Sequence, residues 1–262
     1  MEALAEIGGL VEQNLNYLVP AAGVFIRLGA MFYLLPGVGE TVVSARIRLT
    51  CALALAVLIM PILSEGFGQE SYNVSAAFAL IFIEAIYGLL LGFGFRLMVY
   101  TLQILGNVVS QALSISQVLG EGIATEPNTT VSTLLMMAGV TVLVTLGVHI
   151  EAVGILIMSF EMFPIGTAPN LDGMAYWLNH KSADAFAVGI TLALPFIILN
   201  FVYNAILGFL NRAMPQLMVS FVGMPAITGA GLFLLVISAG AILTTWSRLY
   251  FDSFSSFSSV MP

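Results

Sequence analysis

The sequence predicts an all-α integral membrane protein made of about six long hydrophobic helices, arranged as hairpins and in places broken or bent. Of its 262 residues, 60% are hydrophobic and only 8% are charged. Soluble globular proteins carry about 25% charged residues, so this chain has too few polar groups to cover a water-exposed surface. Its apolar runs also reach the roughly 20 residues that a helix needs to cross about 30 Å of hydrocarbon.

Six apolar runs are separated by segments rich in Gly, Pro, Ser, Asn and acidic residues, which favour turns. The runs cover Leu15–Leu35, Ile47–Leu63, Val74–Leu119, Val131–Met162, Ala185–Leu210 and Leu217–Leu243. They do not alternate between polar and apolar residues, as the strands of about ten residues in outer-membrane barrels do. We therefore expect about six helical spans in a single membrane domain covering residues 1–262.

The basic residues predict the orientation of these spans. Arg46 and Arg48 flank the first connection and Arg212 lies in the fifth. The charged residues of the second connection are acidic, and it has no Lys or Arg. Because Lys and Arg are enriched in cytoplasmic loops, the odd-numbered connections are expected to face the cytoplasm. Both chain ends would then face the opposite side, and Arg248 near the C-terminus is the exception to this pattern.

The third run is too long for one crossing at about 1.5 Å per residue, and its polar residues lie on one helix face. They follow at steps of three or four: Arg96, Tyr100, Gln103, Asn107, Ser110, Ser114, Gln117 and Glu121. Such a stripe can line an aqueous passage, or it can make hydrogen bonds between helices. Gly106, and further on Gly120, Gly122 and Pro127, are expected to let this helix break and fold back.

Two charges lie inside apolar runs, namely Arg27 and Glu84. Each costs about 2.5–3.5 kcal/mol at a helix centre on insertion scales, so each needs a partner or water. The partner could belong to another subunit, or the two could form a buried pair within the chain, or Arg27 could snorkel to the interface. Glu84 and Arg96 lie roughly 18 Å apart along one helix, which excludes a direct pair between them.

No arrangement of residues points to an enzyme, a metal site or a cofactor. His149 and Glu151 are two positions apart and so point about 200° away from each other on a helix. The three aspartates, Asp172, Asp184 and Asp252, lie in or near connections. The net charge of −7 argues against binding to nucleic acid, which requires basic patches.

Four stretches resemble the FliR-like family of flagellar and virulence type III secretion export gates. The most specific is Leu207–Pro225, "LGFLNRAMPQLMVSFVGMP", with its Leu-Asn-Arg, Pro-Gln and Val-Gly-x-Pro elements. Phe25–Ala56 is similar to the first hairpin of the family, and Gly147–Thr167 to its Gly-x-His to Pro-Ile-Gly stretch. Gly106–Pro127 lies where the family has a loop ending in Asp-Pro, although this chain has Glu126-Pro127 there.

The resemblance implies an export-gate subunit in a flagellar basal body, a multi-pass protein of the bacterial inner membrane. It implies a closed-pore assembly with FliP-like and FliQ-like subunits, together with an FlhB-like subunit, through which unfolded flagellar proteins pass. Lipids would surround the assembly, and no cofactor or nucleic acid is implied. A secondary transporter with broken helices is the alternative, since Tyr87–Met98 and Tyr203–Met214 share Tyr, Leu-Gly-Phe, Arg and Met at equal spacing.

The resemblance also suggests two groups of functional residues. A pore plug at residues 106–127 would use plug or pore-facing side chains: Gln103, Asn107, Ser110, Gln111, Ser114, Gln117 and Glu121. Candidate contacts to other subunits are Arg27, Glu84, Arg96, Asn211, Arg212 and Gln216.

The stretch from Asn211 to Pro225 is polar and rich in proline between two apolar runs. Pro215 and Pro225 are expected to interrupt the helix, and Asn211, Arg212 and Gln216 to cap a cytoplasmic hairpin turn that touches neighbouring subunits. An ordinary hairpin, in which the arginine only sets the orientation, is the alternative.

Overall fold

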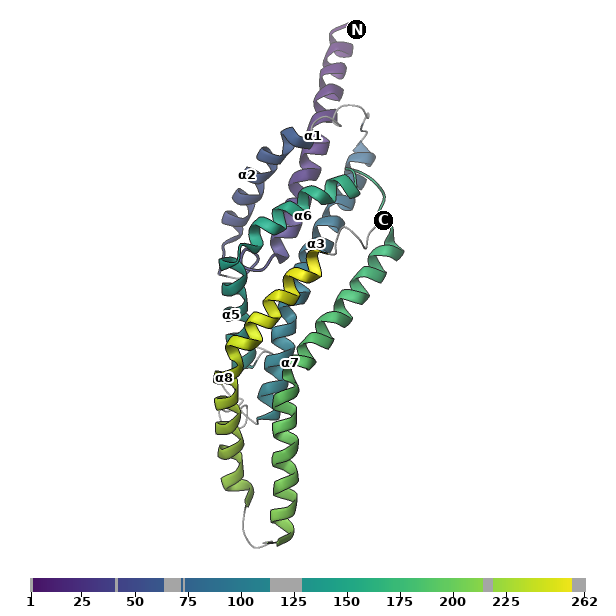
Figure 1. Cartoon of the computed structure of the whole chain (residues 1–262). Helices are drawn as coiled ribbons and strands as arrows, with labels where there is room; N and C mark the ends of the chain where they lie inside the picture. The colour runs from purple at the N-terminus through teal and green to yellow at the C-terminus, as the bar shows by residue number, and fades with distance from the viewer. Residues whose placement is uncertain are drawn as a thin grey trace. The chain divides into compact units, whose positions relative to one another are not determined.

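A computed structural model describes residues 2–40, 42–63, 72, 74–113, 129–213 and 219–255, with the backbone alone in 2–15, 74, 219–222, 224 and 254–255. These residues form helices and no strands, which confirms the predicted all-α class. The helices, shown in Figure 1, are α1 (Glu2–Leu34), α2 (Ala45–Leu63), α3 (Val74–Ala112), α5 (Thr130–Thr145), α6 (Val148–Met162), α7 (Leu171–Ala213) and α8 (Val219–Ser255).

Within the described residues, five helices are long and apolar enough to cross a membrane, and the bent pair α5 and α6 brings the number to as many as six. The expectation of about six long hydrophobic helices, some bent, is therefore confirmed. Polar side chains cap two of the helix starts. The Asn170 side chain accepts a hydrogen bond from the Gly173 N–H at 3.1 Å, and the Thr129 hydroxyl accepts one from Ser132 at 3.3 Å.

One predicted break in the middle of the chain was wrong. Helix α3 runs straight through Gly106 to Ala112, so that glycine does not break it. The apolar run Val131–Met162 is instead divided at Gly147, whose φ of 83° lies in the left-handed region that suits a residue without Cβ. Hydropathy could not reveal this bend because both sides of it are equally apolar.

The later boundaries also differ from the predictions. Helix α7 begins at Leu171, well before Ala185, because a helix tolerates polar residues wherever the packing satisfies them. Pro225 lies inside α8 and does not interrupt the helix, although it removes one hydrogen bond of the helix. Pro215 lies outside the described residues.

The chain forms two compact units. Among the described residues, the first contains those in 2–96 and 144–179, and the second contains those in 97–143 and 180–255. In the first unit, α1 packs against α2 and against the first part of α3. Figure 1 shows these three helices in purple to blue, running alternately down and up.

The second unit is organised around a buried tryptophan. Trp246 of α8 is 1% exposed and donates a hydrogen bond from its indole nitrogen to the Met98 carbonyl at 2.9 Å. Gly139 of α5 lies against this indole and against Leu102, and a side chain there would overlap Leu102. Lys181 of α7 donates two 2.7 Å hydrogen bonds to Ser253 near the end of α8, where a cation complements the helix dipole.

Candidate functional site

The first unit is built on a close approach of α1 and α3. Gly88 and Gly92 lie one turn apart on α3 and face the backbone of α1. A methyl group at Gly88 would overlap the Arg27 carbonyl, and one at Gly92 would lie 2.7 Å from the Met31 carbonyl. Small residues permit such backbone proximity between apolar helices, and here they bring the two intramembrane charges together.

Arg27 and Glu84 form an ion pair inside this unit. The Arg27 Nε donates to Glu84 Oε2 at 2.5 Å, and both side chains are 0% exposed. Of the alternatives that the sequence left open, the structure shows the buried intrachain pair. A role for either residue in contacting another subunit stays a prediction without a test.

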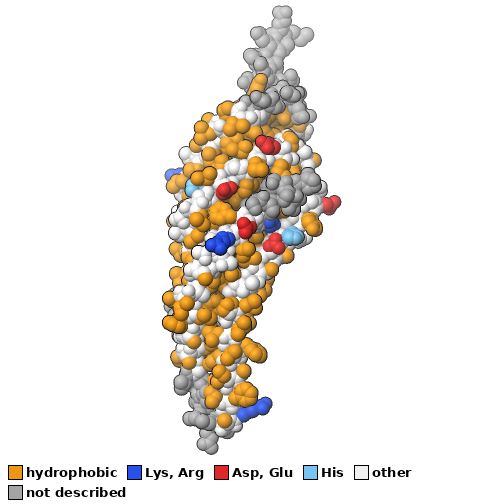
Figure 2. Space-filling view, in the orientation of Figure 1, with side chains coloured by type: hydrophobic (Ala, Val, Ile, Leu, Met, Phe, Trp, Pro, Cys, Tyr) orange, Lys and Arg blue, Asp and Glu red, His pale blue; other side chains and the backbone are white. Residues whose placement is uncertain are grey.

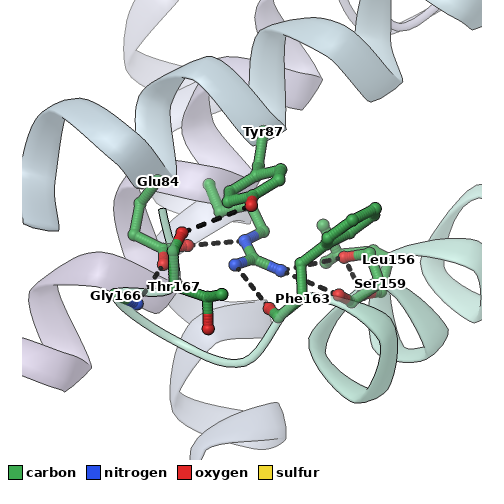
Figure 3. Close-up of polar contacts among 8 residues, drawn as sticks. Glu84, Tyr87, Leu156, Ser159, Phe163, Gly166 and Thr167 are labelled. Carbon is green, nitrogen blue, oxygen red and sulfur yellow. Dashed lines mark hydrogen bonds and ion pairs between the residues drawn. The ribbon is translucent and has the colours of Figure 1, made fainter. Parts of the chain in front are cut away.

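The remaining donors of Arg27 bind the end of α6. Nη1 donates to the Ser159 carbonyl at 3.1 Å and to the Ser159 hydroxyl at 3.2 Å, and Nη2 donates to the Phe163 carbonyl at 3.0 Å. Figure 3 shows Ser159 and Phe163 on one side of the guanidinium and Glu84 on the other. A planar guanidinium with fixed donor directions can serve several acceptors at once, which a lysine ammonium cannot do in the same geometry.

Glu84 and Tyr87 of α3 complete the contact with the segment after α6. Glu84 Oε1 accepts a hydrogen bond from the Gly166 N–H at 3.0 Å, and the Tyr87 hydroxyl donates to the Thr167 carbonyl at 3.3 Å. The Tyr87 ring stacks on Phe163 with centroids 4.8 Å apart. The guanidinium carbon lies 4.9 Å from the Tyr87 centroid and 4.0 Å from that of Phe160, which adds cation–π attraction.

Arg96, also on α3, pairs with Glu40 in the α1–α2 connection. Its Nη1 donates to Glu40 Oε1 at 2.7 Å, with side chains 17% and 29% exposed. This partner lies within the chain, and contact of Arg96 with another subunit remains a prediction. Sequence reasoning missed Glu40, although its position in an otherwise basic connection was the available signal.

The polar face of α3 continues into the second unit. Gln103 and Asn107 are half-buried, Ser110 is buried and Gln111 is exposed. Asn107 accepts a 3.2 Å hydrogen bond from the Thr129 hydroxyl, so at this position the stripe bonds to the residue that caps α5. Ser114, Gln117 and Glu121 lie outside the described residues, as do residues 114–127 of the expected plug.

The residues on either side of that segment are held by neighbouring helices. Leu113 accepts a 2.9 Å hydrogen bond on its carbonyl from the Thr228 hydroxyl of α8, and its side chain fills the space left by Gly231. On the other side, Gly106 of α3 lies directly against Ser132 of α5. The glycine expected to break α3 therefore permits a close helix contact.

The last turn of α7 carries two of the predicted contact residues. Asn211 and Arg212 are both exposed there, immediately before the connection to α8. Gln216, the third, lies outside the described residues. The predicted hairpin turn itself, its cytoplasmic side and its contacts with other subunits stay predictions.

Sequence reasoning also missed the hydrogen-bonding groups around the Arg27–Glu84 pair. Ser159, Phe163 and Gly166 contribute a hydroxyl and backbone groups, which carry no charge pattern. The available signal was indirect, because Arg27 and Glu84 were the charges that the apolar runs left without a nearby partner. The Pro-Ile-Gly stretch marked a turn but not its position against α1 and α3.

Comparison with known proteins places the whole arrangement in one family. Residues 18–253 match the family described as bacterial export proteins, family 1. The chain is 30% identical over 231 residues to the flagellar biosynthetic protein FliR of Caulobacter vibrioides, which covers 88% of this chain and 92% of that protein. It is 26% identical over 247 residues to FliR of Escherichia coli strain K12, with 93% of each chain covered.

FliR of Bacillus subtilis is 26% identical over 233 residues, covering 87% of this chain and 88% of that protein. The similarity thus spans both units and all the helices that hold the buried ion pair. With its long apolar helices, the chain is a multi-pass membrane protein. It belongs to family 1 of the bacterial export proteins, the family of FliR.

Proposed function

We propose that the chain is a subunit of the flagellar protein export gate in the bacterial inner membrane. It forms a closed pore with FliP-like and FliQ-like subunits, in contact with an FlhB-like subunit, and unfolded flagellar proteins pass through that pore. It acts by enclosing a conduit and catalyses no reaction. The relatives named flagellar biosynthetic protein FliR support a role in building the flagellum.

The main support for an assembly of several subunits is the length of α7 together with its apolar surface. Its 43 residues extend about 64 Å, whereas a helix tilted by 40° needs only about 26 residues to cross 30 Å of hydrocarbon. Large hydrophobic side chains nevertheless remain exposed along it: Leu171, Phe186, Ile198, Phe201 and Phe209. Figure 2 shows hydrophobic side chains spread along the whole length of the visible face.

Lipid covers only the part of α7 that lies within the bilayer. The remaining apolar side chains would face water, and exposed hydrophobic surfaces of this extent mark protein interfaces. Sister subunits that wrap the helix remove this cost. A gate assembled from several helical chains therefore accounts for the helix, whereas a monomer surrounded by lipid does not.

The pore-facing role rests on the polar face of α3. Gln103, Asn107, Ser110 and Gln111 offer hydrogen-bonding groups near the end of this helix, and the plug would follow from residue 114 onward. Leu113 and Thr129, on either side of that segment, are tied to α8 and α3. Firm attachment of both flanks is what a plug needs in order to return to the same closed position.

Deletion of residues 115–125 tests the gate. Because α3 and the cap of α5 stay intact, the shortened chain should still assemble with its FliP-like and FliQ-like partners. Reconstituted vesicles are expected to leak small ions with the deletion and to stay tight with the full-length chain. A shortened chain that co-purifies with both partners and remains tight would contradict the plug, and failure of the full-length chain to co-purify would contradict the assembly.

The end of α7 offers a second test. Changing Asn211 and Arg212 together to alanine removes the exposed polar groups there without touching a buried contact. If they bind neighbouring subunits, recovery of the complex should fall about tenfold, as loss of about 1.4 kcal/mol of binding free energy predicts. The matched control is Arg46→Ala, another exposed arginine beside a connection; equal recovery of both variants would leave the pair only an orienting role.

A secondary transporter would need an ionisable site shared between repeats and open to substrate. Within the described residues, the fully buried ion pair is Arg27–Glu84, and its charges are already satisfied inside one unit. Ion flux from the chain reconstituted alone, coupled to a small solute, would favour the transporter.

A further inference from the structure

Helix α8 lies antiparallel to α3 in the second unit and marks where α3 ends. Trp246 of α8 bonds to the Met98 carbonyl. Closer to the start of α8, Gly231 lies against Leu113, the residue that follows α3, and the Thr228 hydroxyl bonds to the carbonyl of the same leucine. The end of α3 is therefore level with residues 228–231 of α8.

Helix α7 accompanies α8 beyond this level. Lys181 of α7 bonds to Ser253 of α8, and further along α7 the Tyr203 hydroxyl lies at Gly223 of α8. Gly223 comes eight residues before Gly231, so at 1.5 Å per residue Tyr203 lies about 12 Å beyond the end of α3. Figure 1 shows these parts of α7 and α8 side by side.

The face of α7 that packs on α3 becomes polar where α3 ends. Gly189, which lies against Ile104 of α3, and the fully buried Ala193 are on this face. At about 100° per residue, Asn200 lies within about 20° of both, and Asn204 follows one turn later. Asn200 is half-buried and Asn204 is exposed. We call these two residues the asparagine face of α7.

The two side-chain amides of this face bind each other and leave further groups available. Asn204 Nδ2 donates to Asn200 Oδ1 and to the Asn200 carbonyl, each at 2.8 Å. Among the described residues, the Asn200 Nδ2 and the Asn204 Oδ1 have no hydrogen-bond partner. Lipid and apolar side chains cannot satisfy these groups, so either a polar segment or water covers them.

Residues 114–128 leave α3 beside this face, and both of their flanks are attached there. The Leu113 carbonyl is bonded to Thr228, and Thr129 is bonded to Asn107. Fifteen residues extend up to about 50 Å, whereas the path from Leu113 to Asn204 and back to Asn107 is about 30 Å. A segment held at both ends also has a high effective concentration at a nearby surface. Seven of its side chains are polar: Ser114, Ser116, Gln117, Glu121, Thr125, Glu126 and Asn128.

We propose that the asparagine face of α7 is the docking site of residues 114–128 of the same chain. Hydroxyl or amide groups of the segment donate to Asn204 Oδ1, and carboxylate or carbonyl oxygens accept from Asn200 Nδ2. The inference deepens the proposed function and rests on it for its consequence, because docking here would hold the plug in one position. The docking itself needs only this chain.

Disulfide formation within the chain tests the docking site and leaves both asparagines in place. In a Cys51→Ala background, Gly208→Cys is combined with Gln117→Cys; a Cβ at Gly208, one turn beyond Asn204, meets no atom within 4 Å. The control pairs Gln117→Cys with Val202→Cys, a position that is 48% exposed on the opposite side of α7 from Asn204. Copper phenanthroline should join the first pair at least fivefold faster, as read from the single-chain band on a non-reducing gel. An equal or lower rate overturns the docking site.

Replacing both asparagines tests whether their amides hold the segment. In the Asn200→Ala, Asn204→Ala variant, the disulfide between positions 208 and 117 should form at least fivefold more slowly. Thr191→Val is the matched control, because this exposed α7 residue bonds through its hydroxyl only within its own helix, and the rate should stay unchanged. An unchanged rate in the alanine variant would mean that water or another polypeptide satisfies the amides, and would overturn the proposal.

Failure of the docking site and failure of the proposed function give different results. If the chain does not co-purify with FliP-like and FliQ-like partners, but the disulfide forms in the chain purified alone, the proposed assembly is wrong and the docking site stands. If the complex is recovered intact and the disulfide forms no faster than in the control pair, the docking site alone is wrong.

Discussion

Glu84→Gln is expected to destabilise the folded chain severely. The change keeps the shape of the side chain but removes the counter-ion of a guanidinium that is 0% exposed. Breaking a buried ion pair by removing one partner costs about 3–5 kcal/mol, because the remaining charge is left uncompensated. The measurement is the fraction of chain that elutes as a single species in mild detergent after stepwise heating, together with swimming motility.

Glu151→Gln is the matched control, since Glu151 lies exposed on α6 and should leave both measurements unchanged. Arg27→Lys should resemble Glu84→Gln, because an ammonium cannot reach Glu84, Ser159 and Phe163 in the geometry of the guanidinium. The double variant Arg27→Met with Glu84→Met should lose less free energy of unfolding than the single variants Arg27→Met and Glu84→Met lose in sum. The difference should be at least about 1 kcal/mol. Additive effects would show that the two side chains act independently, against the geometry.

Gly88→Ala is expected to separate α1 from α3 and to abolish motility. The added methyl would overlap the Arg27 carbonyl and lie 2.8 Å from the Ala30 Cβ, and backbone cannot move aside as a flexible side chain can. Overpacking usually costs about 1–3 kcal/mol, and a clash with a main chain belongs at the upper end. The displacement would also pull Arg27 away from Glu84, so the thermal stability should fall together with function.

Gly29→Ala provides the comparison on the facing helix. Nothing lies within 4 Å of a Cβ added there, so no contact is disturbed. Alanine favours a helix over glycine by up to about 1 kcal/mol, and this variant should be as stable as the original or slightly more so. A similar loss of thermal stability in Gly88→Ala and Gly29→Ala would mean that close packing of α1 against α3 is not the cause. The contact described at Gly88 would then be wrong.

The helical class and the approximate number of long helices could be predicted because they follow from composition. A chain with 8% charged residues has to satisfy its backbone internally, and runs of about 20 apolar residues do so as helices. The family could also be predicted, since the Leu207–Pro225 motif lies in the chain itself. A bend inside an apolar run could not be predicted. Gly147, for example, bends a run that is equally hydrophobic on both sides.

Glycines illustrate the same limit. Gly106 and Gly147 cannot be told apart by hydropathy. In the structure, Gly106 permits close contact with Ser132, whereas Gly147 bends the chain. The difference lies in what surrounds each residue, and a single sequence does not contain that information. Pro225 shows the same limit, since the sequence predicted a break there and the structure has this proline inside α8.

The sequence by itself determined three properties of this protein: that it is a membrane protein, that it is helical, and which family it belongs to. It also showed that Arg27 and Glu84 needed partners, because the cost of an unpaired charge in apolar surroundings depends only on the residue and its neighbours in the chain. Only the tertiary structure decided that these two charges pair with each other, that Arg27 also bonds to the Phe163 carbonyl, and that Glu84 also bonds to the Gly166 N–H. Contacts between residues far apart in the chain depend on how helices pack, and packing is decided by the shapes of side chains on all the helices together.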